Sequence, residues 1–161
     1  MREFKLGGAP VKDAHGVKHL GRVLESVGYE DPGGGVSAMG KKTNALERVI
    51  EAYFENKSRL SHELLALKEF HLKIVEDLFE EQAAKIAEEV HAYFEDLQAF
   101  LKSNKAPNYS FVYDQVVSYG ELLSSTIIHR YFEFQGWKSF WLDARECIKT
   151  DDYYRAANLN W

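Results

Sequence analysis

The spacing of apolar residues predicts a mostly helical chain. Residues 58–104 contain no Gly or Pro, and their apolar side chains recur every three or four positions, which is the period of an amphipathic helix. Because this run exceeds a typical globular helix, we expect an antiparallel helical pair that turns near residues 79–82. A further helix is predicted over residues 109–134, with an irregularity at Gly120 and a stop at Gly136.

The start of the chain has a different pattern. Residues 2–6 alternate charged and apolar side chains and meet Gly7 and Gly8, which predicts a short strand that enters a tight turn. Apolar residues at helical spacing follow over residues 11–27, and Gly28 supplies a stop. The pattern therefore predicts a strand, a turn and a helix in that order.

The next segment is rich in turn residues. Residues 31–35 read Asp-Pro-Gly-Gly-Gly, which favours a loop, and we expect the strand before Ser37 to be short or absent because such residues suit a central strand poorly. Thr43 or Asn44 is expected to cap the following helix, and Glu47 is placed for a capping box.

A last strand is predicted near the end of the sequence. Residues 138–142 are rich in aromatic side chains and follow Gly136, and Asp143 can cap a short turn after them. The order of predicted elements fits an α/β fold, rich in helix, with a small, mainly parallel sheet and a long helical hairpin insertion over about residues 58–104.

Composition narrows the class of protein. The 161 residues suit one domain, and 45% hydrophobic and 28% charged residues are typical of a globular protein. A net charge of −5 argues against nucleic acid as a partner. Cys147 is the single cysteine, so no internal disulfide or thiolate zinc cage can form. Residues 1–8 carry no signal or membrane pattern, so we expect a cytoplasmic protein without a membrane partner.

Two short segments carry the candidate chemistry. Residues 5–8 (Lys-Leu-Gly-Gly) close the first strand, and residues 36–44 (Val-Ser-Ala-Met-Gly-Lys-Lys-Thr-Asn) open a helix. Each brings backbone N–H groups together with a lysine or hydroxyls at a helix N-terminus, where phosphate or carboxylate groups are commonly held. Both segments are therefore candidate anion sites.

These segments resemble the N-terminal part of the aspartate kinases, members of the amino acid kinase family. The family's Lys-Phe-Gly-Gly opening, Ser-Ala-x-x-x-x-Thr-Asn loop and Gly-Glu helix correspond to residues 5–8, 37–44 and 120–121. Residues 141–145 (Trp-Leu-Asp-Ala-Arg) also look like the stretch that follows the Gly-Glu helix. The order of these landmarks carries the resemblance.

The resemblance implies a three-layer α/β/α kinase domain. Such a domain transfers the γ-phosphoryl group of ATP, with Mg²⁺, to the side-chain carboxylate of L-aspartate, the first step of lysine, threonine and methionine biosynthesis. Phosphoryl transfer of this kind depends mainly on positioning and charge stabilisation. No protein ligand to the metal is identified in the sequence.

Family roles carry over to the phosphate side of the predicted site. Lys5 would be the catalytic residue that neutralises the transferring phosphate, and Gly7 and Gly8 would let backbone amides approach the phosphates of ATP. Leu6 and Pro10 depart from the family's Phe and Ser, and Pro10 removes a hydroxyl and an N–H from this turn. The alternative for Lys5 is an ordinary surface lysine on an edge strand.

Family roles also carry over to the substrate side. Ser37 and Thr43 would contact L-aspartate or the loop that holds it, Asn44 would support that loop, and Glu121 would receive the substrate ammonium. Ser37, Thr43 and Asn44 could instead be plain turn and cap residues, and Glu121 could face solvent.

The resemblance covers a part of the family's catalytic domain. The family's Gly-Arg-Gly-Gly-Ser-Asp stretch, its main nucleotide-binding segment and its regulatory ACT domains have no counterpart before Trp161. We therefore expect the 161 residues alone not to turn over, and we expect a homodimer because uncovered strands expose an edge and apolar surface. The competing function is a non-catalytic helical interaction module on a kinase scaffold.

Overall fold

The protein is described from a computed structural model. The described residues are 2–8, 11–28, 32–40, 43–105, 108–151, 153–155 and 157–159, with the backbone alone described for residues 2–8 and 32.

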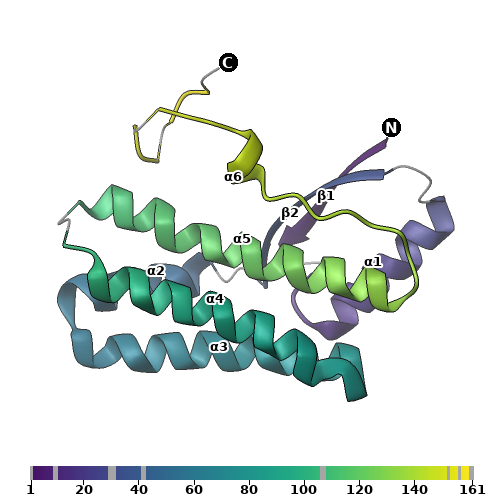
Figure 1. The fold of residues 1–161 in the computed structure, drawn as a ribbon, viewed down its shortest axis with the longest axis horizontal. Coiled ribbons are helices and arrows are strands. Elements are labelled where there is room, and N and C mark those ends of the chain that lie inside the picture. Colours follow the sequence, from purple (N-terminus) through teal and green to yellow (C-terminus); the bar gives the residue numbers. More distant parts are fainter. Residues whose placement is uncertain are drawn as a thin grey trace.

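Helices dominate the described chain (Figure 1). In chain order the elements are β1 (Arg2–Gly8), α1 (Ala14–Val27), β2 (Pro32–Met39), α2 (Thr43–Glu55), α3 (Lys57–Phe79), a 3₁₀ turn (Glu80–Gln82), α4 (Ala83–Ser103), α5 (Tyr109–Phe134) and α6 (Ala144–Cys147). The predicted helix-rich α/β chain with a small parallel sheet is confirmed, because β1 and β2 pair in parallel.

The long helical run folds back on itself as predicted. α3 ends at Phe79 and α4 begins at Ala83, so the reversal falls within the predicted residues 79–82. Glu80 has a positive φ of 48°, which is uncommon for a residue other than glycine, and it lies where the chain reverses without a Gly or Pro. The other end of α3 is capped by Asn56, whose side chain accepts a hydrogen bond from Ser58 N at 3.1 Å.

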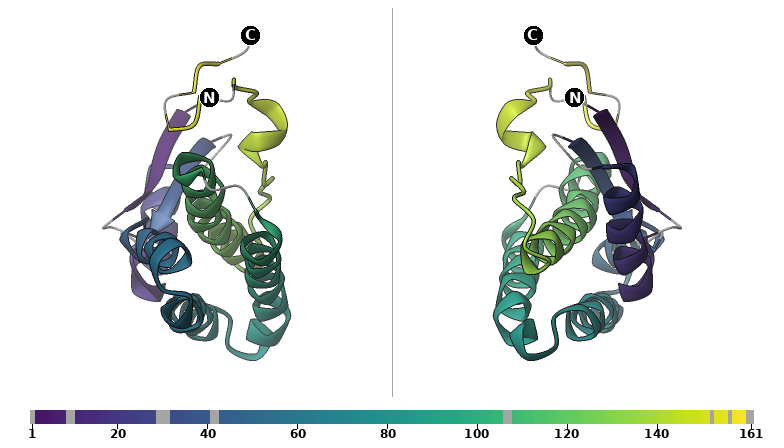
Figure 2. Two further views of the ribbon diagram at one scale, coloured as in Figure 1. Left: turned by 90° about the vertical axis from the view of Figure 1, so that its left-hand side faces the viewer. Right: turned by 90° about the vertical axis from the view of Figure 1, so that its right-hand side faces the viewer.

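The hydrophobic core lies among helices α2 to α5 and reaches β2 and α1 (Figure 2). The largest fully buried side chains come from all of these helices and from β2; they include Phe79, Phe94, Met39, Leu46, Ile50, Leu97, Leu123 and Ile127. No helix among the described residues is long and apolar enough to cross a bilayer.

The strand β2 corrects the sequence prediction. The sequence predicts a loop over residues 31–35, with a short or absent strand after it. That prediction is wrong for residues 32–35, because β2 begins at Pro32 and is eight residues long. Backbone pairing in a ladder needs no side chain, so the three glycines pair with β1, in the register Glu3 with Gly33, Phe4 with Gly34 and Lys5 with Gly35. Pro32 takes the first strand position, where a missing N–H is tolerated.

The predicted last strand is also wrong. Residues 138–142 have an extended course without a ladder partner in the described chain, and they run along α5 (Figure 1). Side-chain contacts hold them there: Trp141 Nε1 donates to Ser125 Oγ at 3.0 Å. The cap predicted at Asp143 is confirmed, because its side chain accepts from Arg145 N at the start of α6.

The helix irregularity predicted at Gly120 is wrong; the missing side chain instead allows β2 and α2 to approach α5. The helix runs unbroken from Tyr109 to Phe134. A Cβ on Gly120 would lie 2.7 Å from Leu46 Cδ1 and 3.1 Å from Ala38 Cβ. The missing side chain therefore sets how closely the sheet packs on α5.

We expect Gly120→Ala to destabilise the protein by about 1–3 kcal/mol through overpacking. Alanine has the better helix propensity by about 1 kcal/mol, so a net loss would identify the crowding at Leu46 and Ala38. Urea denaturation measures the change. Gly33→Ala is the control, because no heavy atom lies within 4 Å of its added Cβ. A Gly120→Ala variant as stable as the parent would contradict this packing.

Candidate functional site

The candidate site lies where the two parallel strands end. Gly8 pairs with Met39, the last residues of β1 and β2. Because the carboxyl ends of parallel strands meet at one edge of a sheet, the predicted phosphate turn and the predicted substrate loop leave the sheet together. We call this region the strand edge; it comprises Gly7, Gly8, residues 36–40, Thr43 and Asn44.

An irregularity in the ladder falls on the predicted substrate residues. Leu6 pairs with Val36 and Gly8 with Met39, so β2 advances three residues while β1 advances two. Ser37 and Ala38 of β2 therefore lie opposite the single residue Gly7 of β1, which makes a bulge. A bulge of this kind redirects side chains and is common beside functional sites. Ser37 is half-buried here and Ala38 is buried.

The loops that follow both strands are tied together. Gly40 N donates to Val11 O at 3.2 Å, which joins the turn after β2 to the segment before α1. Gly40 has a φ of 56°, and a Cβ there would lie 3.2 Å from Lys12 O, so this position favours glycine on both counts. α1 starts after Asp13, whose side chain accepts from Gly16 N at 2.8 Å.

A buried hydroxyl fastens β2 to α5. Met39 N donates to Ser124 Oγ at 2.8 Å, and Ser124 Oγ donates to Gly120 O at 2.6 Å. Ser124 is fully buried, so these bonds are shielded from water. The hydroxyl and the close contact at Gly120 together fix the end of β2 next to the turn of α5 that carries Glu121.

Glu121 is exposed, and its carboxylate makes no hydrogen bond or ion pair with another described residue. The carboxylate therefore faces solvent, which is one of the two positions expected for Glu121 from the sequence. Its backbone neighbour Gly120 contacts Ala38 and Leu46, so Glu121 lies beside the end of β2 and the start of α2. An exposed, unpaired carboxylate at this point can receive a cation.

Thr43 and Asn44 lie at the start of α2 but not at its cap. The helix already begins at Thr43, so its cap position falls on residue 42, outside the described residues. The predicted capping box is wrong because the Glu47 carboxylate accepts from Tyr113 Oη at 3.0 Å instead. Thr43 is half-buried and Asn44 is exposed.

The phosphate-side residues are described through the backbone. Lys5 pairs with Gly35 inside the ladder, and Gly8 ends β1 beside Met39. The side chain of Lys5 and all of Pro10 lie outside the described residues. The structure thus brings the backbones of residues 5–8 and 36–40 together, and the role of the Lys5 ammonium stays a prediction.

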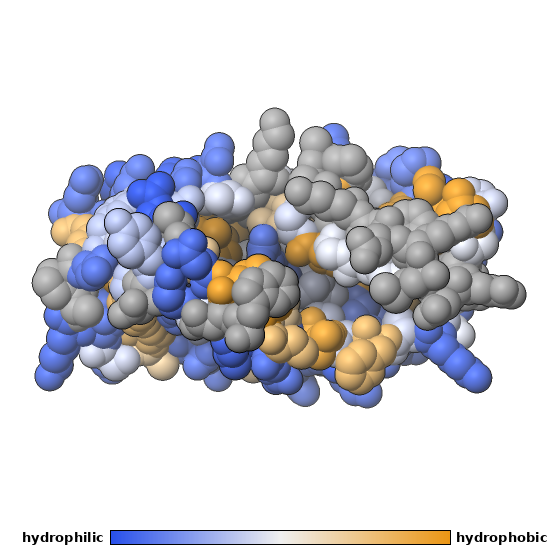
Figure 3. All heavy atoms as spheres, turned by 90° about the horizontal axis from the view of Figure 1, so that it is seen from above, coloured by the Kyte–Doolittle hydropathy of each residue, from blue (hydrophilic) through white to orange (hydrophobic). Residues whose placement is uncertain are grey.

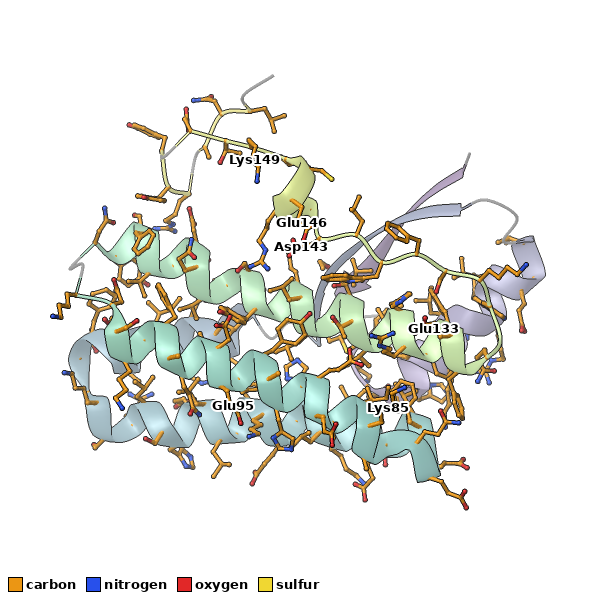
Figure 4. The ribbon with its side chains drawn as sticks, in the orientation of Figure 1. Lys85, Glu95, Glu133, Asp143, Glu146 and Lys149 are labelled. Carbon is orange, nitrogen blue, oxygen red and sulfur yellow. The ribbon has the colours of Figure 1, made fainter. Side chains whose placement is uncertain are left out.

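Sequence reasoning missed a polar pocket on the far part of α5. A pocket of about 340 Å³ lies between α4, α5 and the segment after α5. Ser139 Oγ lies 2.9 Å from His129 Nδ1, and Arg130 bonds both Glu89 on α4 and Glu133. Figure 4 shows Glu133 on this part of α5. The four-residue spacing of His129 and Glu133 on a predicted helix was an available signal.

The charges in this pocket shift each other's titration. Burial lowers the pKa of His129, against the opposing effect of Glu133. The hydrogen bond to Glu133 leads the interactions that raise the pKa of Arg130, and the same bond lowers the pKa of Glu133. Folding therefore favours the neutral form of His129 and the charged form of Arg130.

We expect Ser124→Ala to destabilise the protein by about 1–3 kcal/mol, because it leaves Met39 N–H buried without its acceptor. Ser118→Ala is the matched control on the same helix, since its hydroxyl bonds only the nearby Gln115 O. Urea denaturation compares the two. Hydrogen exchange should also speed up at Met39 in Ser124→Ala alone, and an unchanged rate there would count against the proposed fastening.

The folded pKa of His129 is lower than its usual 6.5, so the unfolded chain binds more protons just below that pH. The stability contributed by the neutral ring is present above 6.5 and is lost as the pH falls towards the folded pKa. We expect unfolding free energy to drop more between about pH 7.5 and pH 5.5 in the parent than in His129→Gln. Equal drops in denaturation experiments would exclude this effect.

No protein-family model matches the chain. It is 31% identical over 158 residues to "Aspartokinase 1, chloroplastic" of Arabidopsis thaliana, covering 93% of this chain and 27% of that protein. It is 30% identical over 161 residues to "Aspartokinase 2, chloroplastic" of the same plant, covering 95% of this chain and 28% of that protein. The chain thus spans little more than a quarter of the curated relatives.

Solved structures share the fold. Crystal structures of Escherichia coli aspartokinase III match 99% of this chain and 35% of theirs. The complex with lysine and aspartate, in the T-state, gives a TM-score of 0.85 at 21% identity. The complex with aspartate and ADP, in the R-state, gives 0.83 at 22% identity. The resemblance to the aspartate kinase family that residues 5–8, 37–44 and 120–121 predicted is therefore confirmed, over a part of those enzymes.

Proposed function

We propose that the strand edge is the aspartate-binding side of an aspartate kinase site. The observation that carries this proposal is that Glu121 is exposed beside the bulged end of β2, with no partner for its carboxylate among the described residues. A carboxylate can receive the ammonium of L-aspartate, while the hydroxyls of Ser37 and Thr43 offer donors to a carboxylate. Asn44 would support the loop that carries these hydroxyls, and its backbone carbonyl accepts from Arg48 Nη1 at 3.3 Å.

The same edge suits a phosphate on its other side. Gly7 and Gly8 end β1 next to Met39, and they permit a close approach of backbone amides to the phosphates of ATP. Lys5 supplies the cation that offsets the charge of the transferring phosphoryl group. Transfer from ATP to the side-chain carboxylate of L-aspartate is the reaction we assign to the complete site.

The ligands in the matched crystal structures support this proposal. The matched aspartokinase III structures hold aspartate and ADP, the substrate and nucleotide that the strand edge would receive. Among the described residues no three His, Cys, Asp or Glu side chains gather to hold a metal ion. We therefore assign Mg²⁺ to the phosphates of ATP, the usual arrangement for this ion. Binding is the appropriate readout because the chain spans about a quarter of its relatives.

We expect Glu121→Gln to weaken L-aspartate binding by about tenfold or more, because it removes the charged partner of the substrate ammonium. Glu95→Gln is the control, a matched change on the exposed side of α4 (Figure 4). Isothermal titration with L-aspartate, with and without ATP, measures both affinities. A titration with D-aspartate tests whether binding depends on the stereochemistry of the ligand.

Three outcomes separate the candidate functions. Loss of aspartate binding in Glu121→Gln, with Glu95→Gln unchanged, supports the kinase site. Equal binding in both variants removes Glu121 from the site. An absence of binding for both L-aspartate and ATP in the parent chain favours a non-catalytic helical module. The homodimer and cytoplasmic location expected from the sequence stay predictions.

A further inference from the structure

A second candidate site lies far from the strand edge, at the end of the helical bundle. α2 ends there, α3 begins there and α4 ends there, and the three ends enclose a groove of about 820 Å³. The left view of Figure 2 looks along the bundle from this end. We call it the lysine groove; its lining includes Phe54, Leu65, Lys57, Lys68, Lys102 and Lys105.

The floor of the lysine groove is apolar. Leu64 and Leu101 are buried beneath it, while Phe54 and Leu65 stand 39% and 53% exposed at its sides. Apolar surface of this extent in a concave site is a feature of ligand pockets. The volume is also within the range of about 300–1,000 Å³ that small-molecule sites occupy.

The rim of the groove is positively charged. Lys57, Lys68, Lys102 and Lys105 line it, and no acidic side chain does. None of the four ammonium groups makes an ion pair or hydrogen bond with another described residue. In a chain with a net charge of −5, four lysines around one groove, with no acidic partner in the described part of the chain, concentrate positive potential there.

One wall of the groove is fixed before any ligand arrives. Tyr53 Oη donates to Asn104 O at 3.0 Å, and Asn104 Nδ2 donates to Tyr53 Oη at 3.2 Å. These bonds tie the end of α2 to the end of α4. A preformed wall lowers the ordering cost of binding.

We propose that the lysine groove binds a single-chain amphipathic anion, an apolar chain with a carboxylate or phosphate head. The apolar chain would lie on Leu64, Leu65 and Phe54, and the anionic head would pair with the lysine ammonium groups on the rim. Lys57 begins α3 and Lys105 follows the end of α4, so the antiparallel hairpin brings these two lysines to the same end as Lys102. Charge attraction then adds to apolar burial.

The groove favours a small amphiphile over a docked helix. A bound helix needs anchors spaced along several turns of a long groove. Phe54 and Leu65 are the only strongly exposed large apolar side chains in this lining, too few to anchor several turns of a helix. A free amphiphile can place one chain on this floor and one head on this rim.

Isothermal titration with dodecanoate and with dodecyl phosphate, each below its micelle concentration, tests the proposal and separates the two heads. Dodecyltrimethylammonium carries the same chain with a positive head and should not bind. We expect Lys102→Gln to weaken anion binding by about tenfold, and Leu65→Ser to weaken it as well. Lys85→Gln is the matched control, an exposed lysine at the opposite end of α4 (Figure 4). All three positions are exposed, so the fold is spared.

Several results would overturn the proposal. Equal binding of the cationic amphiphile would show a non-specific apolar surface. Equal weakening in Lys85→Gln would show general charge attraction. Binding of an acidic amphipathic peptide, or of anionic vesicles alone, without binding of either free anion would assign the groove to a protein or membrane partner. Because the readout is amphiphile binding, these results are independent of aspartate binding at the strand edge.

Discussion

The close approach of β2 to α5 at Gly120 is the contact on which the rest of the structure depends. Without a Cβ at Gly120, Ala38 and Leu46 come within ordinary packing distance of the helix backbone. That approach puts Met39 N within hydrogen-bond reach of Ser124 Oγ. A two-stranded sheet alone has too little apolar surface to be stable, so it needs this helix beneath it. The pairing of β1 with β2 brings the two halves of the strand edge together, and α5 fixes where that edge lies in the fold.

Helical periodicity predicted most of the fold. The reversal within residues 79–82 and the course of α5 follow from apolar spacing, because each helix buries a stripe of side chains in one core. β2 could not be found this way. Its glycines have no side-chain pattern to read, and their pairing depends on β1, some thirty residues earlier in the chain. The prediction of a strand over residues 138–142 failed for the opposite reason. Their aromatic side chains favoured a strand, but this segment contacts α5 instead, through Trp141 and Ser125.

The candidate site was predictable in part. Short motifs predicted Ser37, Thr43 and Glu121 as site residues. Parallel pairing of β1 and β2 explains why residues 5–8 and 36–39 meet, and the close contact at Gly120 brings Glu121 to the same region. The motifs could not give the bulge, because a bulge depends on the register between two strands. Nor could they give Ser124, a serine within an apolar helix whose role depends on its contact with Met39. The types of side chain in a motif indicate which ligand a site could bind. The tertiary contacts that hold the site in place cannot be read from the motif.

α2 connects the strand edge to the lysine groove. It begins at Thr43 and ends at Glu55, a length of about 20 Å. Its buried side chains, among them Leu46, Val49 and Ile50, pack into the common core. Coupling between two sites requires an element with two arrangements of similar free energy. A helix so packed has one arrangement, so a ligand in the groove and a ligand at the strand edge should bind independently. A mixed titration that showed mutual dependence would therefore indicate that α2 shifts as a unit, with Gly120 as the point where that shift would meet α5.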